Sequence, residues 1–289
     1  MNQPTQNARP SGPTDTVSLG PARVSRFIVG HNPPCGNSHV SDAMNADMAA
    51  YFTDDNVLDL YRRAESLGVR TLMIRGDYRM LRWVELHRRD GGTLNVVGQT
   101  ASEMHDVFRN IRVMAAAGVD AVYHHGTQTD KFWREGHIDR AADYLKAVRQ
   151  AGVAVGLGTH QPEIIEYAEE RGWDLDFYMA SFYNISRTPR ESMMVTGVAA
   201  YDEEQYLPDD RDRMTRLIRR VAKPVLAFKV LAASRHCDTQ DHVRDAFRYA
   251  YTHVKPTDAV VVGLFPKTVD QLTLDLGYAR EACAAPGTA

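Results

Sequence analysis

The chain has 289 residues, a length that fits a single α/β barrel of about 250 residues plus a tail. Its formal net charge is −3, so its charge does not favour nucleic acid or an anionic membrane as a partner. Its three cysteines are widely spaced, which argues against a disulfide framework or a structural zinc ribbon. Because it shows neither a signal peptide nor an apolar run near the about 20 residues that span a bilayer, we expect a cytoplasmic protein.

The first segment is polar, and we expect residues 1–15 to form a disordered tail ahead of one barrel domain at 16–285. A short strand pair is expected from Thr16, and its second strand, R-V-S-R-F-I-V-G at 23–30, is the first core strand. A loop of turn-forming residues follows at 30–39.

From there, strands and helices alternate along the chain. Glycines such as Gly68 and Gly152 end the expected helices, and Asp54 and Pro162 suit helix starts. The further expected strands are at 71–74, 94–97, 119–126, 154–157, 175–181, 225–229 and 258–263. The expected helices are at 56–66, 80–89, 102–117, 138–151, 162–171, a stretch ending near 221, 239–253 and from 269 onward.

This alternation predicts a parallel (β/α)8 TIM barrel. A doubly wound open sheet is the alternative fold, but no glycine-rich dinucleotide-binding fingerprint follows the first strand. On a barrel, polar residues at the carboxyl ends of the strands converge on one mouth, where chemistry is normally found.

Several segments resemble the aldo-keto reductase superfamily. They include V-D-A-V-Y-H-H at 119–125, G-V-A-V-G-L-G-T-H-Q-P-E at 152–163 and D-F-Y-M-A-S-F-Y-N at 176–184, with further similarity at 19–30 and 258–272. The resemblance follows the order of the barrel, so it implies the aldo-keto-reductase-like scaffold.

The resemblance does not extend to the reductase chemistry. It implies a strand-end histidine, which is His125 here, but the lysine that it implies at the end of the third strand has no counterpart in V-V-G-Q-T. Gly158, Thr159 and Met179 stand where it implies residues that hold the nicotinamide amide. NADPH is therefore the less favoured cofactor, and an NADPH-dependent carbonyl oxidoreductase with an altered tetrad is an alternative function.

The polar strand-end residues instead predict acid-base chemistry on a small polar, oxygenated molecule, because imidazole groups titrate near neutral pH. The expected catalytic groups are His125, His160, Asp77 and Lys229. The expected substrate ligands are Asn32, Arg75, Gln99, Tyr183, Asn184 and Arg187.

A metal-assisted version of this chemistry is left open. His31, His39 and His124 are candidate ligands for zinc, iron or manganese, which imidazole and carboxylate groups commonly bind, although no H-x-H or H-E-x-x-H spacing supports them. Successive strand residues point to opposite faces, so only one of His124 and His125 can face the mouth, and the sequence leaves open which one.

Lys229 has two interpretations. A lysine desolvated in a barrel mouth can form a Schiff base with a carbonyl substrate, but it more commonly pairs with a carboxylate, for which Asp77 is a candidate. The long connection at 182–209 is expected to be a lid, with Arg187 and Arg190 available to clamp a carboxylate or phosphate.

These observations predict an enzyme, with lyase, isomerase or hydrolase activity all within reach. A non-catalytic barrel that binds a small ligand is the alternative from another class. The expected partner is a small-molecule substrate, and a homo-oligomer is compatible with the sequence.

Overall fold

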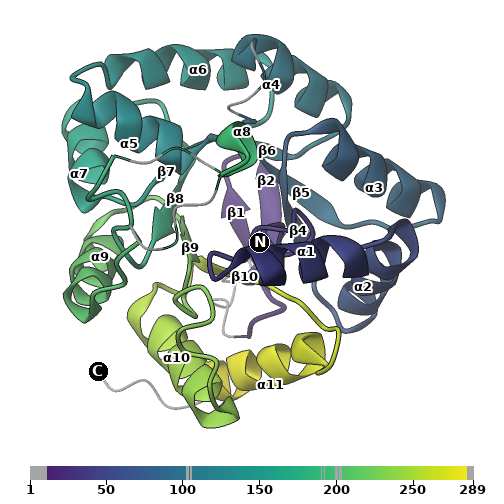
Figure 1. The fold of residues 1–289 in the computed structure, drawn as a ribbon. Coiled ribbons are helices and arrows are strands. Elements are labelled where there is room, and N and C mark those ends of the chain that lie inside the picture. The colour runs from purple at the N-terminus through teal and green to yellow at the C-terminus, as the bar shows by residue number, and fades with distance from the viewer. Residues whose placement is uncertain are drawn as a thin grey trace, which may run out of the picture.

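The computed structural model describes residues 12–101, 104, 106–189, 191, 193–198, 201 and 204–284. Its centre is a closed barrel of parallel strands in the order β10-β3-β4-β5-β6-β7-β8-β9, which confirms the predicted (β/α)8 fold. Helices surround this barrel, as Figure 1 shows in a view along the strands. Most of the expected disordered tail, residues 1–11, lies outside the described part of the chain.

The barrel strands are short and buried. They are β3 (Phe27–Gly30), β4 (Thr71–Arg75), β5 (Asn95–Gln99), β6 (Ala121–His124), β7 (Ala154–Thr159), β8 (Phe177–Ser181), β9 (Val225–Phe228) and β10 (Ala259–Gly263). The register pairs Arg75 with Gln99 and Thr159 with Ala180, so the carboxyl ends of neighbouring strands lie at similar heights.

Most of the helices form an outer layer around the barrel, as Figure 1 shows. The helices are α1 (Asp42–Tyr51), α2 (Asp54–Ser66), α3 (Tyr78–Arg89), α4 (Val107–Ala116), α5 (Gly126–Arg134), α6 (Asp139–Gln150), α7 (Pro162–Glu170), α8 (Met193–Thr196), α9 (Pro208–Arg220), α10 (Gln240–His253) and α11 (Gln271–Ala284). None of the described helices is both long and apolar enough to cross a membrane.

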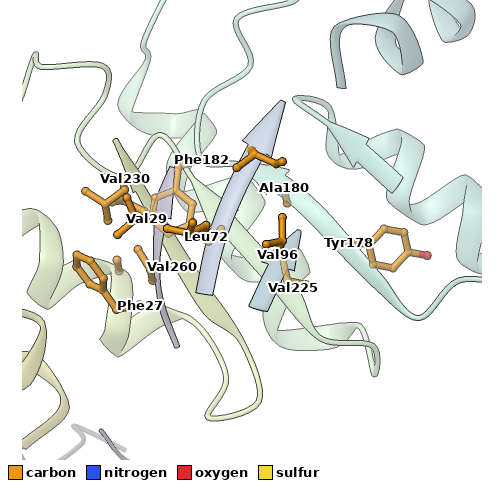
Figure 2. Close-up of a cluster of buried hydrophobic side chains, with 14 of the residues drawn as sticks. Phe27, Val29, Leu72, Val96, Tyr178, Ala180, Phe182, Val225, Val230 and Val260 are labelled. Carbon is orange, nitrogen blue, oxygen red and sulfur yellow. The ribbon is translucent and has the colours of Figure 1, made fainter. Parts of the chain in front are cut away.

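Side chains alternate between the inside and the outside of the barrel, as a period of two residues requires. The outward set, which includes Phe27, Val29, Leu72 and Val96, packs beneath the helices (Figure 2). The inward set belongs to a second cluster inside the barrel, with members such as Tyr123. Barrel strands thus bury both faces, which explains their near-continuous apolar sequences.

An antiparallel hairpin, β1 (Thr16–Leu19) and β2 (Ala22–Ser25), accompanies the barrel. Its apolar side chains belong to the same cluster as the inward barrel residues, so the hairpin packs against the barrel interior. The expected core strand at 23–30 is therefore two strands, β2 and β3, which separate at Arg26.

The helices α1, α4 and α5 differ most clearly from the expectation. Helix α1 lies in a stretch for which no helix was expected, and Ser41 caps it through a bond from the backbone N–H of Met44. Helix α4 begins at Val107 and is capped by Asp106, later than the expected start at 102, which is outside the described residues. Helix α5 replaces an expected loop directly after β6.

Candidate active site

A cavity of about 390 Å³ lies at the carboxyl ends of the barrel strands. Strand-end residues and the loop after β3 form its base, while Met44 and Met48 of α1 and Met194 of α8 contribute to its wall. Helices α1 and α8 overlie the strands in Figure 1. The long connection at 182–209 therefore contributes to this wall through Met194, and its role as a lid stays a prediction. Arg190, one of its two proposed clamps, lies outside the described residues.

The central feature of the site is the pair formed by His160 and Asp130. His160 follows β7 and lines the cavity, and its Nδ1 lies 2.6 Å from Oδ2 of Asp130 on α5. Asp130 is only 1% exposed and does not line the cavity, so its carboxylate lies behind the imidazole. This bond fixes the orientation of the imidazole ring and makes Nδ1 the donor to the carboxylate.

Three further groups donate to the same carboxylate. The hydroxyl groups of Thr159 and Ser186 lie 2.6 Å and 2.7 Å from its oxygens, and the backbone N–H of His160 points to it at 3.3 Å. A buried carboxylate needs such donors, because an unpaired one costs several kcal/mol. Asp130 is thus held as an acceptor that can stabilise an imidazolium on His160.

His125 faces the mouth, and His124 does not. His125 lines the cavity at the start of α5, next to Gly126, where an added Cβ would lie 3.4 Å from Cε1 of His160. His124 is on the outer face of β6, with its ring stacked against Phe132 and Tyr144. Burial lowers the pKa of His124 to about 4, so the ring is neutral at physiological pH.

Lys229 is part of a chain of polar contacts across the mouth. Its Nζ lies 3.2 Å from Nε2 of His39, and Nδ1 of His39 lies 2.8 Å from Glu204. Because an ammonium group donates, Nε2 of His39 accepts and its Nδ1–H donates to the carboxylate. Asn32 also contacts Nε2 of His39, at 3.2 Å. Lys229 therefore lies beside His39, which in turn donates to Glu204, and the candidate ion pair between Lys229 and Asp77 is not formed.

Arg75 is the last residue of β4, and His31 directly follows the neighbouring strand β3. Arg75 is 3% exposed, lines the cavity and lies 3.5 Å from Asp77. Asp77 itself caps α3 through the backbone N–H of Met80 and is not part of the lining. Burial, aided by the positive charge of Arg75, lowers the pKa of His31 to about 3. His31 is therefore a neutral polar group, whereas Arg75 provides positive charge.

Gln99 closes the base of the cavity together with Tyr123. The hydroxyl of Tyr123 donates to Oε1 of Gln99 at 2.8 Å, and both residues line the cavity. Burial raises the pKa of Tyr123, so the phenol stays protonated and keeps the O–H that it donates to Gln99. The expected contact residue Gln99 is thus oriented by a tyrosine from the next strand.

Three of the expected substrate ligands lie away from the cavity lining. Tyr183 is buried and bonds His236 at 2.9 Å, while Asn184 and Arg187 bond Asp210 on α9. Asn184 and Arg187 thus fix the segment after β8 to α9, and Tyr183 fixes it to the connection between β9 and α10. Their position away from the lining was not visible in the sequence, because it depends on the packing of Tyr183 in the outer hydrophobic cluster and on contacts with Asp210, which is distant in the chain.

The proposed histidine metal set is not assembled. His31 and His39 line the cavity, but His124 points away from it, against α5 and α6. Within the described ranges, no group of three or more His, Cys, Asp and Glu side chains is arranged to hold a metal ion. The residues present therefore do not fit the metal-assisted interpretation.

Asp130, the carboxylate that contacts His160, was not among the expected site residues, because no helix was expected between the strand at 119–126 and the helix at 138–151. Tyr123 carried a usable signal: it precedes His125 by two positions, so both must share the inward face of the strand. Ser186 and Glu204 carried none, since they come from the long connection after β8.

No protein-family model matches the chain, and no curated protein matches it. Among solved structures, it is similar to dihydropteroate synthase from Xanthomonas albilineans, with a TM-score of 0.53, 13% identity and coverage of 95% of this chain and 100% of the other. It is similar to Gox0644 in its apo form, with a TM-score of 0.53, 9% identity and coverage of 95% and 96%. The BexX/CysO complex of Amycolatopsis orientalis gives a TM-score of 0.50, 12% identity and coverage of 92% and 91%. At these identities the similarity establishes the barrel fold alone, and the aldo-keto reductase resemblance stays an expectation.

Proposed function

We propose that this protein is an enzyme that moves a proton at a carbon next to the carbonyl group of a small polar substrate, as lyases and isomerases do. The buried Asp130–His160 pair carries this proposal. A histidine that lines a cavity, with a fully hydrogen-bonded carboxylate behind it, has the arrangement of an oriented general base.

The other cavity residues fit complementary roles. His125 follows the strand next to that of His160 and can return a proton to the substrate or the leaving group. Lys229 and Arg75 carry positive charge at the same mouth, where they can stabilise negative charge that develops on a carbonyl oxygen. Because Lys229 donates to His39, we assign it this electrostatic role in preference to a Schiff base.

We keep the resemblance to aldo-keto reductases within this proposal for the scaffold alone. Where that resemblance implies a lysine at the end of the third barrel strand, this chain has Gln99, whose Oε1 accepts a hydrogen bond from Tyr123. A carboxamide in this position can bind substrate but cannot supply a proton as an ammonium group does.

Proton exchange with solvent tests the proposal directly, because it measures the abstraction of a carbon-bound proton whatever step follows. The protein is incubated in deuterated water with a panel of hydroxy acids, keto acids and small sugars, and the loss of carbon-bound protons is followed by NMR. We expect exchange with at least one compound in the wild type. His160→Gln and Asp130→Asn should slow it by about 10²–10⁴-fold, which is the usual contribution of general acid-base catalysis.

His124→Leu is the matched control, because His124 is a buried histidine on β6, the strand next to that of His160, but lies outside the cavity. It should retain the wild-type exchange rate. If a compound exchanges at the same rate with His160→Gln as with the wild type, His160 is not the base. If the panel binds in the cavity but none of it exchanges, the protein is a binding barrel.

A further inference from the structure

The cavity continues beyond the mouth, into the space between the amino-terminal ends of α10 and α11. There its lining includes Gln240 and Val243 of α10, Leu274 and Asp275 of α11, and Cys237. Cys237 and Gln240 are exposed, whereas Asp275 is only 5% exposed. We call this part the Asp275 lobe, since Asp275 is its buried charged residue.

Asp275 is the one acidic side chain in the cavity lining of the described chain. Among the residues that the structure describes, none forms a hydrogen bond or an ion pair with its carboxyl group, whose oxygens are not fully enclosed and face the cavity. Burial alone raises the pKa of Asp275 to about 7, because no positive charge is close enough to oppose it. Asp275 thus differs from Asp130, which is also buried but has donors on both oxygens.

Leaving a buried carboxyl group without a partner is unfavourable, and native structures rarely contain one without a reason. The chain could have placed an apolar residue here, as it does at the neighbouring Leu274 and Val243. A carboxyl group that faces a cavity gains its partner when a ligand enters. A cationic ligand group would both donate hydrogen bonds and neutralise the charge.

The cavity is therefore electrically polarised along its length. Arg75 and Lys229 provide positive charge at the mouth, and Asp275 provides negative charge in the lobe. A ligand that satisfies both ends has carbonyl or carboxylate oxygens at one end and a cationic group at the other. The cavity volume of about 390 Å³ restricts such a ligand to a small molecule.

We propose that the Asp275 lobe is a subsite for the protonated amino group of a small ligand. The substrate class is then a short amino compound whose carbonyl or carboxylate end lies at the mouth, beside His160. The substrate part of this inference rests on the proposed function, whereas the amine subsite is a statement about binding alone.

Matched ligands test the subsite by calorimetry at about pH 8, where the Asp275 carboxyl is ionised, given its pKa of about 7. The probes are ω-amino carboxylates of increasing chain length, each compared with the ω-hydroxy carboxylate and the dicarboxylate of the same length. We expect the best amino compound to bind the wild type about 10- to 100-fold more tightly than its hydroxy counterpart, as one charge-assisted hydrogen bond provides.

In Asp275→Asn this preference should disappear, and in His160→Gln it should persist. The proposal is overturned if the wild type binds the amino and hydroxy compounds equally, if it prefers the dicarboxylate, or if Asp275→Asn keeps the amine preference. The two proposals fail separately. Amine preference without any proton exchange removes the proposed chemistry and leaves the subsite, while proton exchange without any amine preference in binding removes the subsite and leaves the chemistry.

Discussion

The buried carboxyl of Asp275 has a measurable effect on stability, which replacement by asparagine should reveal. Its pKa rises from 3.8 in the unfolded chain to about 7 in the fold. Each pKa unit corresponds to about 1.36 kcal/mol, so the ionised carboxylate destabilises the fold by about 4 kcal/mol. Because the folded-state pKa of this acid is raised, the destabilisation is absent below pH 3.8, grows as the pH rises to about 7 and is constant above that value.

Asp275→Asn removes this pH-dependent term while it keeps the shape of the side chain. In the absence of ligand, we expect the variant to melt about 7 °C above the wild type near pH 8, since about 4 kcal/mol corresponds to that shift for a chain of 289 residues. The difference should decrease steadily as the pH falls from about 7 towards 4. The thiol of Cys237 is a titratable neighbour of Asp275. Desolvation of the thiol, together with the charges of Asp275 and Asp238, raises the pKa of Cys237 to about 11, outside this window, although other atoms of Cys237 are exposed.

Melting curves from pH 4 to pH 8 by differential scanning calorimetry measure the effect. Asp143→Asn is the control, because Asp143 is an exposed aspartate on α6, and it should show no comparable increase with pH. A melting temperature of Asp275→Asn that equals or falls below that of the wild type at every pH would refute the reasoning. The carboxyl would then be hydrated or paired, and the amine subsite would lose its main support.

Replacing His125 and His160 by alanine, singly and together, should give a double variant with little less proton-exchange activity than the worse single variant, because groups in one mechanism are not additive. His124→Leu should keep its exchange rate, and its free energy of unfolding should fall only by about 1 kcal/mol, the contribution of one lost hydrogen bond. Deleting residues 1–12 should leave both melting temperature and exchange rate nearly unchanged, whereas a fall of many degrees would show that this segment packs on the barrel. NADPH should bind weakly or not at all by calorimetry, and micromolar affinity would restore the reductase alternative.

The amino-acid sequence by itself determined the barrel and much of its mouth. Short apolar segments that alternate with helix patterns can bury both faces only in a parallel sheet covered by helices. The carboxyl ends of such strands meet at one rim, so Arg75, Gln99, His125, His160 and Lys229 were expected there, and all five line the cavity. Because side chains alternate along β6, the inward side chain of Tyr123 also implies that His125, two positions later, faces inward.

Only the tertiary structure decided how these groups are paired. The carboxylate of Asp130 reaches His160 because α5 forms directly after β6 and lies against β7. No local sequence pattern predicts this packing. Glu204 reaches His39 across 165 positions of the chain, and their contact depends on where the connection after β8 folds over the mouth. In the sequence, Asp275 looks like any acid on a helix surface. Its burial follows from the packing of α11 against α10, because packing, and not residue type, determines whether a carboxyl group stays solvated.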